Sequence, residues 1–138
     1  MRRAIELAKI AVSKGETAVG SLIVQDGKIL SEGIEAVRTA MDVSAHAEMI
    51  AIRQACRDLR TFDLSDCALY TTAEPCFMCS YAVRRTRIGT VVIGRSTSHI
   101  GGHSSRYPIL TDSRIVGWSK PPRIVSGVLK VECEALHS

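Results

Sequence analysis

The sequence of 138 residues predicts an α/β fold built as one domain, residues 1–138. Segments whose apolar residues recur at helical spacing alternate with short runs rich in valine and isoleucine, an order typical of α/β proteins. One strand–helix–strand stretch, residues 67–94, has the length of a parallel crossover, which should be right-handed. A chain of this length can bury one substantial core and is short for two.

The first third of the chain predicts a helix followed by a hairpin. Residues 4–14 place apolar side chains on one side and charged ones on the other, and Gly15 is a suitable C-terminal cap. The dipeptide Asp26-Gly27 lies between two apolar runs and is a hairpin-turn signal. The expected elements are a helix at 4–14, antiparallel strands at 18–25 and 28–35, and a loop at 36–44.

The rest of the chain predicts further helices and strands in alternation. Residues 45–59 have an apolar side with helical spacing, and Gly89–Gly94 (Gly-Thr-Val-Val-Ile-Gly) is typical of a buried strand. Serines and Gly101-Gly102 then predict a loop, and Pro121-Pro122 marks a boundary. The expected elements are a helix at 45–59, a strand at 67–72, a helix at 76–85, a strand at 89–94, a loop at 95–118, a strand at 123–126 and a helix at 127–135.

The composition is that of an ordinary soluble protein, with 46% apolar and 23% charged residues. The net charge of +4 comes from positive pairs that are scattered along the sequence. A basic balance can favour nucleic acid, but here no cluster of lysines and arginines accompanies it. Nucleic acid is therefore possible as a partner but disfavoured.

Five cysteines are present, which is an odd number. No stretch resembles a signal peptide, and no run approaches the roughly 20 apolar residues of a membrane span. We therefore expect a cytoplasmic protein with reduced thiols and no membrane partner, in which cysteine pairs serve metal binding or catalysis rather than disulfides. Cys56, Cys67 and Cys133 lie in apolar patterns and are expected in the core.

Cys76 and Cys79 are the first candidate metal ligands. Three residues apart on a helix, they share one face. Pro75 is well tolerated at a helix start, where its missing N–H would be unpaired. Both thiols then lie in the first helical turn, where the helix dipole favours thiolates. Taken alone, this pair is equally typical of a redox pair, a zinc knuckle or coincidence.

His46 and Glu48 complete the pattern. They are two residues apart, but at the start of a helix both side chains lean towards the N-terminus and can reach an ion off the helix end. His46 with the two cysteines gives three zinc ligands and an open fourth position, which is typical of catalytic zinc. Glu48 is then placed to carry the proton of the attacking water.

A purely structural zinc knuckle is the alternative interpretation. Such a site needs a fourth protein ligand, for which His99, His103 and Cys133 are the candidates. In that case Glu48 would be a solvated helix residue.

The motifs His46-Ala47-Glu48 and Pro75–Cys79 resemble those of the zinc-dependent cytidine deaminase-like superfamily. The likeness is greatest to the branch that holds tRNA adenosine deaminase, bacterial guanine deaminase and fungal cytosine deaminase. Gly20–Val24, Leu69–Thr72 and Arg87–Gly89 are also similar to that branch. The resemblance covers about residues 4–94, with a weaker similarity at 123–136.

This resemblance implies a three-layer α/β/α fold with a central five-stranded mixed sheet, assembled as a homodimer or a higher homo-oligomer. It implies Zn²⁺ on His46, Cys76 and Cys79, with Glu48 as the general acid and base. It also implies that the Ala47 backbone N–H hydrogen-bonds the base and that the backbone at Glu74 faces the amino group.

The chain departs from the branch in ways that bear on the substrate. Where members carry Gly-x-Asn, Gly33-Ile34-Glu35 stands here, and residues 95–99 lack the Asp and Lys that tRNA adenosine deaminase uses for nucleic-acid contacts. We expect Glu35 to enter the pocket and accept hydrogen bonds from an amidine-like edge, because a buried carboxylate without donors is costly. Alternatively, Glu35 faces solvent or pairs with Arg38.

Aromatic residues are few, so any stacking surface must use a small set. Trp118 is the preferred candidate to stack on a base, ahead of Phe77, His103 and Tyr107. Each of these four residues is equally consistent with ordinary packing.

We therefore expect a zinc-dependent hydrolytic deaminase, a hydrolase of C–N bonds in cyclic amidines. The expected substrate is a small free nucleobase or amino-heterocycle, guanine-like or aminotriazine-like, as in purine metabolism. One alternative is a tRNA-specific adenosine deaminase, disfavoured by the missing Asp and the absence of a basic cluster. A second is a non-catalytic, zinc-stabilised RNA-binding domain.

Overall fold

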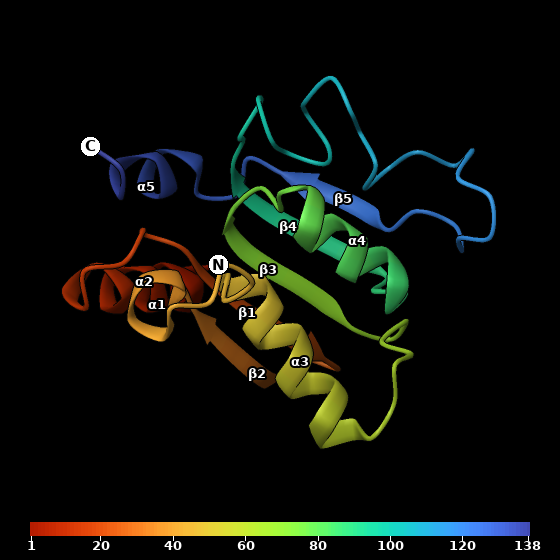
Figure 1. Ribbon diagram of the computed structural model, residues 1–138, viewed down its shortest axis with the longest axis horizontal. Helices are drawn as coiled ribbons and strands as arrows, with labels where there is room; N and C mark the ends of the chain where they lie inside the picture. The colour runs from red at the N-terminus through yellow and green to blue at the C-terminus, as the bar shows by residue number, and fades with distance from the viewer.

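A five-stranded mixed sheet lies at the centre of the computed structural model, which describes residues 1–138 (Figure 1). The helices are α1 (Arg2–Ser13), α2 (Val37–Ala40), α3 (Ala47–Leu59), α4 (Phe77–Arg85) and α5 (Lys130–Ala135), and the strands are β1 (Gly20–Gln25), β2 (Lys28–Ile34), β3 (Ala68–Ala73), β4 (Thr90–Arg95) and β5 (Arg123–Ser126). The strand order is β2-β1-β3-β4-β5. β1 is antiparallel to both β2 and β3, whereas β3, β4 and β5 are parallel.

Helices cover both faces of the sheet. Because side chains alternate along a strand, Ile23 of β1 packs in the core cluster that contains Ala51 of α3 and Val83 of α4. Its neighbour Leu22 packs instead against Leu7 of α1. The sheet thus has α3 and α4 on one face and α1 on the other, which confirms the three-layer α/β/α fold.

The structure refines two of the predicted segments. Residues 36–44, predicted as a loop, contain the single-turn helix α2. The last helix begins at Lys130 rather than near residue 127, because Gly127 (φ +79°) and Leu129 (φ +52°) adopt left-handed backbone conformations. The remaining predicted helices and strands are confirmed within a few residues of their ends. No helix has the length and apolar character that crossing a membrane requires.

The long segment between β4 and β5 is held to α4 by one buried arginine. Arg84 is 3% exposed, and its guanidinium donates to the carbonyl oxygens of Ile109 (2.8 Å), Asp112 (2.9 Å) and Ser119 (2.9 Å). The Trp118 ring lies 4.9 Å from the guanidinium carbon. These carbonyl dipoles and the ring face replace the water that a buried cation loses.

We expect Arg84→Lys to lower the free energy of unfolding by about 3 kcal/mol, because a lysine ammonium cannot reproduce a planar fork of hydrogen bonds to several carbonyls. Arg85→Lys is the matched control. Arg85 is exposed, and surface substitutions of this kind usually stay within about 0.5 kcal/mol. Urea denaturation of both variants measures the difference, and equal losses in the two would contradict the anchoring role.

Candidate active site

Two helix N-termini meet at one end of the sheet. His46 is the N-cap residue of α3 and Cys76 is the N-cap residue of α4, both with extended backbone. Each helix therefore directs the positive end of its dipole towards the same place. The predicted helix at 45–59 includes His46, whereas in the structure α3 begins one residue after it.

The sheet sets how close these helix starts can come. Gly33 of β2 lies against the Ala47 backbone, and a Cβ on Gly33 would collide with the Ala47 carbonyl oxygen. On the parallel side, Ala73 at the end of β3 pairs with Arg95 at the end of β4. The chain leaves β3 through Glu74 to Cys76, so the site lies outside the carboxyl ends of parallel strands, where ligands of α/β proteins commonly bind.

The predicted zinc ligands come together in the folded chain. The Nδ1 atom of His46 lies 3.5 Å from Cys76 Sγ and 3.6 Å from Cys79 Sγ. Tetrahedral zinc with ordinary Zn–S and Zn–N bond lengths requires N···S separations of about 3.6 Å. The three donors therefore fit zinc without rearrangement.

The fourth-ligand candidates of the structural-knuckle alternative are not among the clustered donors. The groups of His, Cys and carboxylate side chains that could hold a metal comprise His46, Cys76 and Cys79 in one set, and Glu35, His46 and Glu48 in another. His99, His103 and Cys133 belong to neither set. A zinc ion held by His46, Cys76 and Cys79 would therefore have none of these three candidates as a fourth ligand, and the Glu48 carboxyl group lies beside the donors.

His46 and Cys76 stabilise each other's charged forms, whereas Cys79 keeps its proton. Hydrogen bonds from Cys79 and then His46 lower the pKa of Cys76 to about 4. The Cys76 side chain in turn raises the pKa of His46 to about 9. The hydrogen bond to Cys76, with burial, raises the pKa of Cys79 well above its ordinary value. Metal binding must displace the remaining protons, so it releases them to solvent.

Glu48 is buried next to this cluster, with only 3% of its surface exposed. Burial raises the pKa of its carboxyl group to about 7. Its Oε2 lies 3.7 Å from Cys79 Sγ, and its Oε1 accepts a hydrogen bond from the Thr71 hydroxyl at 3.2 Å. A carboxyl group that titrates near neutrality can both take and return a proton under physiological conditions.

Thr71 is a site residue that the motifs alone do not reveal. It is fully buried in β3, and its hydroxyl accepts from Ser21 (2.9 Å) while lying within hydrogen-bond distance of Glu48. The available signal is the pair of threonines at 71–72, which are polar residues in a strand otherwise expected to be apolar. The Thr71 hydroxyl also lies 2.9 Å from the Ala73 carbonyl oxygen, so its single proton is shared between that carbonyl and the Glu48 carboxyl group that it adjoins and helps to orient.

A cavity of about 230 Å³ opens over these residues. This volume is below the roughly 300–1,000 Å³ of drug-sized ligand pockets and suits a single heterocycle. Its walls are formed by Thr17, Val19, Glu35, His46, Glu48, Ala73, Glu74, Cys76, Arg95, Thr97, His99, Ile100 and His137.

Glu35 enters this cavity, as predicted, but it has a protein partner there. It is 8% exposed, and its Oε1 accepts a hydrogen bond from the Ala47 backbone N–H at 2.9 Å. The alternative pairing with Arg38 does not form, because that guanidinium donates to the Gly15 carbonyl. The Ala47 N–H, which the resemblance assigns to the base, is therefore engaged by Glu35.

Glu74 holds the loop after β4 against the cavity. Its carboxylate accepts hydrogen bonds from the backbone N–H groups of Thr97 (3.2 Å), His103 (2.9 Å) and Ser104 (2.8 Å), and from the Ser104 hydroxyl (2.6 Å). Its backbone carbonyl, predicted to face the substrate amino group, accepts from the Thr97 hydroxyl at 3.3 Å.

The predicted stacking role of Trp118 is not supported by its position. Trp118 is absent from the cavity wall and packs edge-on against Tyr81, at a centroid distance of 5.6 Å, and over Arg84. Phe77 and Tyr107 pack edge-on against each other at 6.1 Å. The packing interpretation therefore describes these three aromatic residues.

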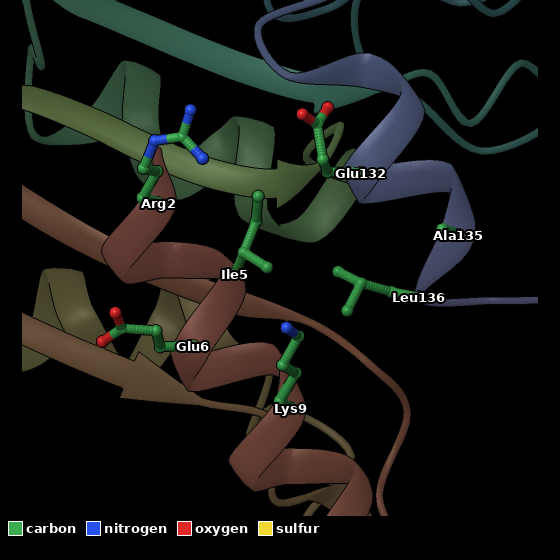
Figure 2. A pocket seen from close by; sticks show the side chains of 7 residues that line it. All are labelled: Arg2, Ile5, Glu6, Lys9, Glu132, Ala135 and Leu136. Atoms are coloured by element: carbon green, nitrogen blue, oxygen red, sulfur yellow. The ribbon is translucent and has the colours of Figure 1, made fainter.

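A second cavity, of about 430 Å³, lies between α1 and α5 (Figure 2). Ile5 and Leu136 extend towards one another across it, while Arg2 and Glu132 lie near its upper rim (Figure 2). The cavity has no histidine or cysteine in its wall, and its charged residues are two basic and two acidic. It lacks the chemical groups of an active site in spite of its larger size.

Comparisons with known proteins place this site in a family. The model of the family described as cytidine and deoxycytidylate deaminase zinc-binding region matches residues 1–95. The tRNA-specific adenosine deaminase of Aquifex aeolicus is 42% identical over 125 residues, covering 88% of this chain and 83% of that protein. A structure from a study of A-to-I editing by tRNA:A34 deaminases aligns at a TM-score of 0.89 with 29% identity, covering 96% of this chain and 94% of its own. Guanine deaminase from Bacillus subtilis is 43% identical at a TM-score of 0.67, covering 69% of this chain and 61% of its own.

These relatives correct the expected substrate and partner. Curated relatives that are 36–42% identical along 88% or more of this chain are tRNA-specific adenosine deaminases. The prediction of a free nucleobase substrate in purine metabolism is therefore wrong, and so is the disfavouring of nucleic acid. The physical reason lies partly in Glu35, since the carboxylate that suggested an amidine-like ligand already accepts the Ala47 N–H. In addition, the spacing of basic residues along the sequence does not show which of their side chains lie near one another in the folded protein.

The structure and the relatives agree on the chemistry of the site. Three clustered donors fit zinc, a buried carboxyl group adjoins them, and the five-stranded sheet is that of the aligned structures. The chain therefore belongs to the zinc-binding cytidine and deoxycytidylate deaminase family.

Proposed function

We propose that this protein is a tRNA-specific adenosine deaminase, which converts adenosine to inosine in tRNA by hydrolysis. The observation that carries the reaction is the buried Glu48 carboxyl group beside the His46, Cys76 and Cys79 donors. The identity of 42% along 88% of the chain to a tRNA-specific adenosine deaminase supports the choice of substrate.

In the proposed reaction, His46, Cys76 and Cys79 hold zinc. When bound, zinc lowers the pKa of a water molecule and so supplies a nucleophile at neutral pH. Glu48 accepts the proton of that water and returns it to the ring nitrogen next to the attacked carbon. Glu48 then transfers the proton of the newly added hydroxyl to the exocyclic amine, which leaves as ammonia while the hydroxyl becomes the carbonyl, so that adenosine and water give inosine and ammonia.

The remaining residues of the cavity orient and enclose the base. Thr71 helps to orient the Glu48 carboxyl group, and Glu74 keeps the loop at 97–104 closed against the cavity. Because the cavity has room for one heterocycle, the target base must leave its stack to enter, which costs least in a single-stranded loop. Cytoplasmic residence, a homo-oligomeric assembly and a single domain at 1–138 stay predictions.

The first test is deamination of a stem–loop RNA with one adenosine in its loop. We expect Glu48→Gln to lower the deamination rate by about 10²- to 10⁴-fold, the usual contribution of a general acid–base, while zinc content stays at the wild-type level. Inosine formation and bound metal are measured in the same samples. Glu132→Gln, a change at an exposed residue of α5, is the matched control. A Glu48→Gln variant that deaminates the RNA at the wild-type rate would contradict the proposed mechanism.

The second test concerns the ligands. Cys76→Ser should lose zinc, whereas Cys56→Ser should keep it, because Cys56 lies outside the donor cluster. Zinc retention of the wild type should fall as the pH is lowered, since protons compete for the thiolates and for His46. A chromogenic chelator measures the released metal across the pH range, and equal retention by the two variants would refute the assigned ligands.

The third test uses the raised pKa of Glu48 in zinc-free protein. The pKa is about 7 when folded, against an ordinary value of 4.5. A raised folded-state pKa stabilises the protein below the ordinary value, and this stabilisation is lost as the pH rises through about 7. Glu48→Gln, which cannot ionise, should therefore be more stable than wild type by about 3 kcal/mol at pH 8 relative to the difference at pH 4. Urea denaturation at the two pH values measures this, and a difference that does not change with pH would count against burial as the cause.

A further inference from the structure

We propose that Arg95 binds a backbone phosphate next to the target nucleotide, so that the active-site cavity itself selects a polynucleotide over a free base. This inference rests on the proposed function and adds the group that recognises the sugar–phosphate strand. The argument uses the position of Arg95, the partners of its neighbours and the charge of the cavity.

Arg95 is fixed at the place where the strand ends meet the zinc-ligand turn. It is the last residue of β4 and pairs with Ala73 of β3. Its backbone carbonyl accepts a hydrogen bond from the Glu74 N–H at 2.9 Å, two residues before Cys76. The Arg95 backbone is therefore tied to the same turn that carries the metal ligand, and its half-buried side chain contributes to the cavity wall.

The guanidinium of Arg95 has no acidic partner. The ion pairs of the protein join Arg3 to Glu6 and Glu32, Arg114 to Asp112, and Lys130 to Glu134. Arg95 takes part in none of them and donates no side-chain hydrogen bond, in contrast to Arg84 with its carbonyl partners. Its five N–H donors, arranged as a planar fork, are therefore free for a ligand.

The acidic neighbours in the cavity are already engaged elsewhere. Glu74 accepts from the backbone of the following loop, Glu35 from the Ala47 N–H, and Glu48 from the Thr71 hydroxyl. Arg95 is the only lysine or arginine in the cavity wall. Three carboxyl groups would repel an approaching RNA strand, so this single cation decides whether a phosphate can lie at the cavity.

His137 lies on the same part of the cavity wall. Both His137 and Arg95 line this cavity, and burial, followed by the positive charge of Arg95, lowers the pKa of this histidine. A phosphate held by the Arg95 guanidinium would therefore lie in the same cavity as this histidine. Guanidinium with phosphate is a frequent bidentate pair, and a neutral imidazole can supply one further donor.

The test uses zinc-loaded full-length protein and a short stem–loop RNA with one adenosine in its loop. Binding is measured by fluorescence anisotropy over a range of salt concentrations, and turnover is measured as inosine formed. Arg95→Gln should weaken binding at low salt by about tenfold, the loss of one hydrogen-bonded charge. The slope of log affinity against log salt should become shallower by about 0.7, the contribution of one single-strand phosphate.

Arg123→Gln is the matched control, because Arg123 is exposed at the opposite, amino-terminal end of the parallel strands. It should leave both the affinity and the salt slope unchanged. Arg95→Lys keeps the charge without the planar fork, so it should restore the slope while recovering only part of the affinity. If Arg95→Gln proves unstable in a thermal melt, Arg95→Lys and the modified RNAs described next decide the question.

Neutral methylphosphonate links, placed one at a time on either side of the target adenosine, locate the contact. One of them should weaken wild-type binding by about tenfold and have no further effect on Arg95→Gln, as expected for two changes that remove the same interaction. Additive losses at every position, or an Arg95→Gln protein that binds like Arg123→Gln, would overturn the phosphate site. So would a wild-type protein that does not bind the RNA.

These readouts separate the two proposals. If the wild type binds the RNA with the Arg95 dependence described but forms no inosine, the phosphate site stands and the proposed function fails. If inosine forms at a rate that Arg95→Gln does not change at sub-saturating RNA, the function stands and the phosphate site fails.

Discussion

The active site depends on the hydrogen bonds that the Glu74 carboxylate accepts. This buried side chain lies between β3 and the first zinc cysteine, and it receives three backbone N–H groups and one hydroxyl from the loop after β4. Accepted hydrogen bonds from Ser104, His103 and Thr97 keep its pKa low in spite of burial, so the carboxylate stays charged and the bonds stay strong. The loop after β4, which forms part of the cavity wall, is thereby held to the turn that carries Cys76.

The metal ligands and the proton carrier follow from the same arrangement. The parallel pairing of β3 and β4 brings their carboxyl ends together, and Gly33 lets the start of α3 lie directly on the sheet. His46 thereby reaches the two cysteines of α4 at distances that suit zinc. Glu48, the second residue of α3, is buried beside them, and its pKa rises because water is excluded. The packing of the two helix starts against the sheet thus determines both the geometry of the metal site and the raised pKa of Glu48.

Much of this could be predicted from the sequence. His46, Glu48, Cys76 and Cys79 are close pairs along the chain at helix starts, so local spacing already fixes which way they point. The elements follow from apolar periodicity, which a helix or strand shows within its own residues. The single-turn helix α2 was missed because four residues carry no periodicity.

The substrate could not be predicted in the same way, because it depends on contacts between distant residues. The sequence predicts that the Glu35 carboxylate accepts hydrogen bonds from a ligand, whereas in the structure it accepts one from the backbone N–H of Ala47, twelve positions later. Trp118 was expected at the base, whereas Arg84 holds it 34 positions away along the chain. In both cases the residue that contacts the side chain belongs to another helix or strand. The spacing of residues within a motif does not predict such a contact.

Two polar anchors, Glu74 and Arg84, hold the long segment between β4 and β5 mainly through its main chain. Glu74 accepts mostly from backbone N–H groups, and the hydrogen bonds of Arg84 all go to backbone carbonyls. Because every residue type offers the same carbonyl oxygen and nearly every type the same N–H, these anchors do not depend on which side chains the segment carries. Substitutions of exposed side chains in this segment can therefore reshape the cavity rim without loosening it from the metal site. Gly101, Gly102 and Leu110 are exceptions, because a Cβ on either glycine would collide with Glu74 or Ser80 and because Leu110 is fully buried in the core. In evolutionary terms, the fold separates a chemistry that must stay fixed from a recognition surface that is free to vary.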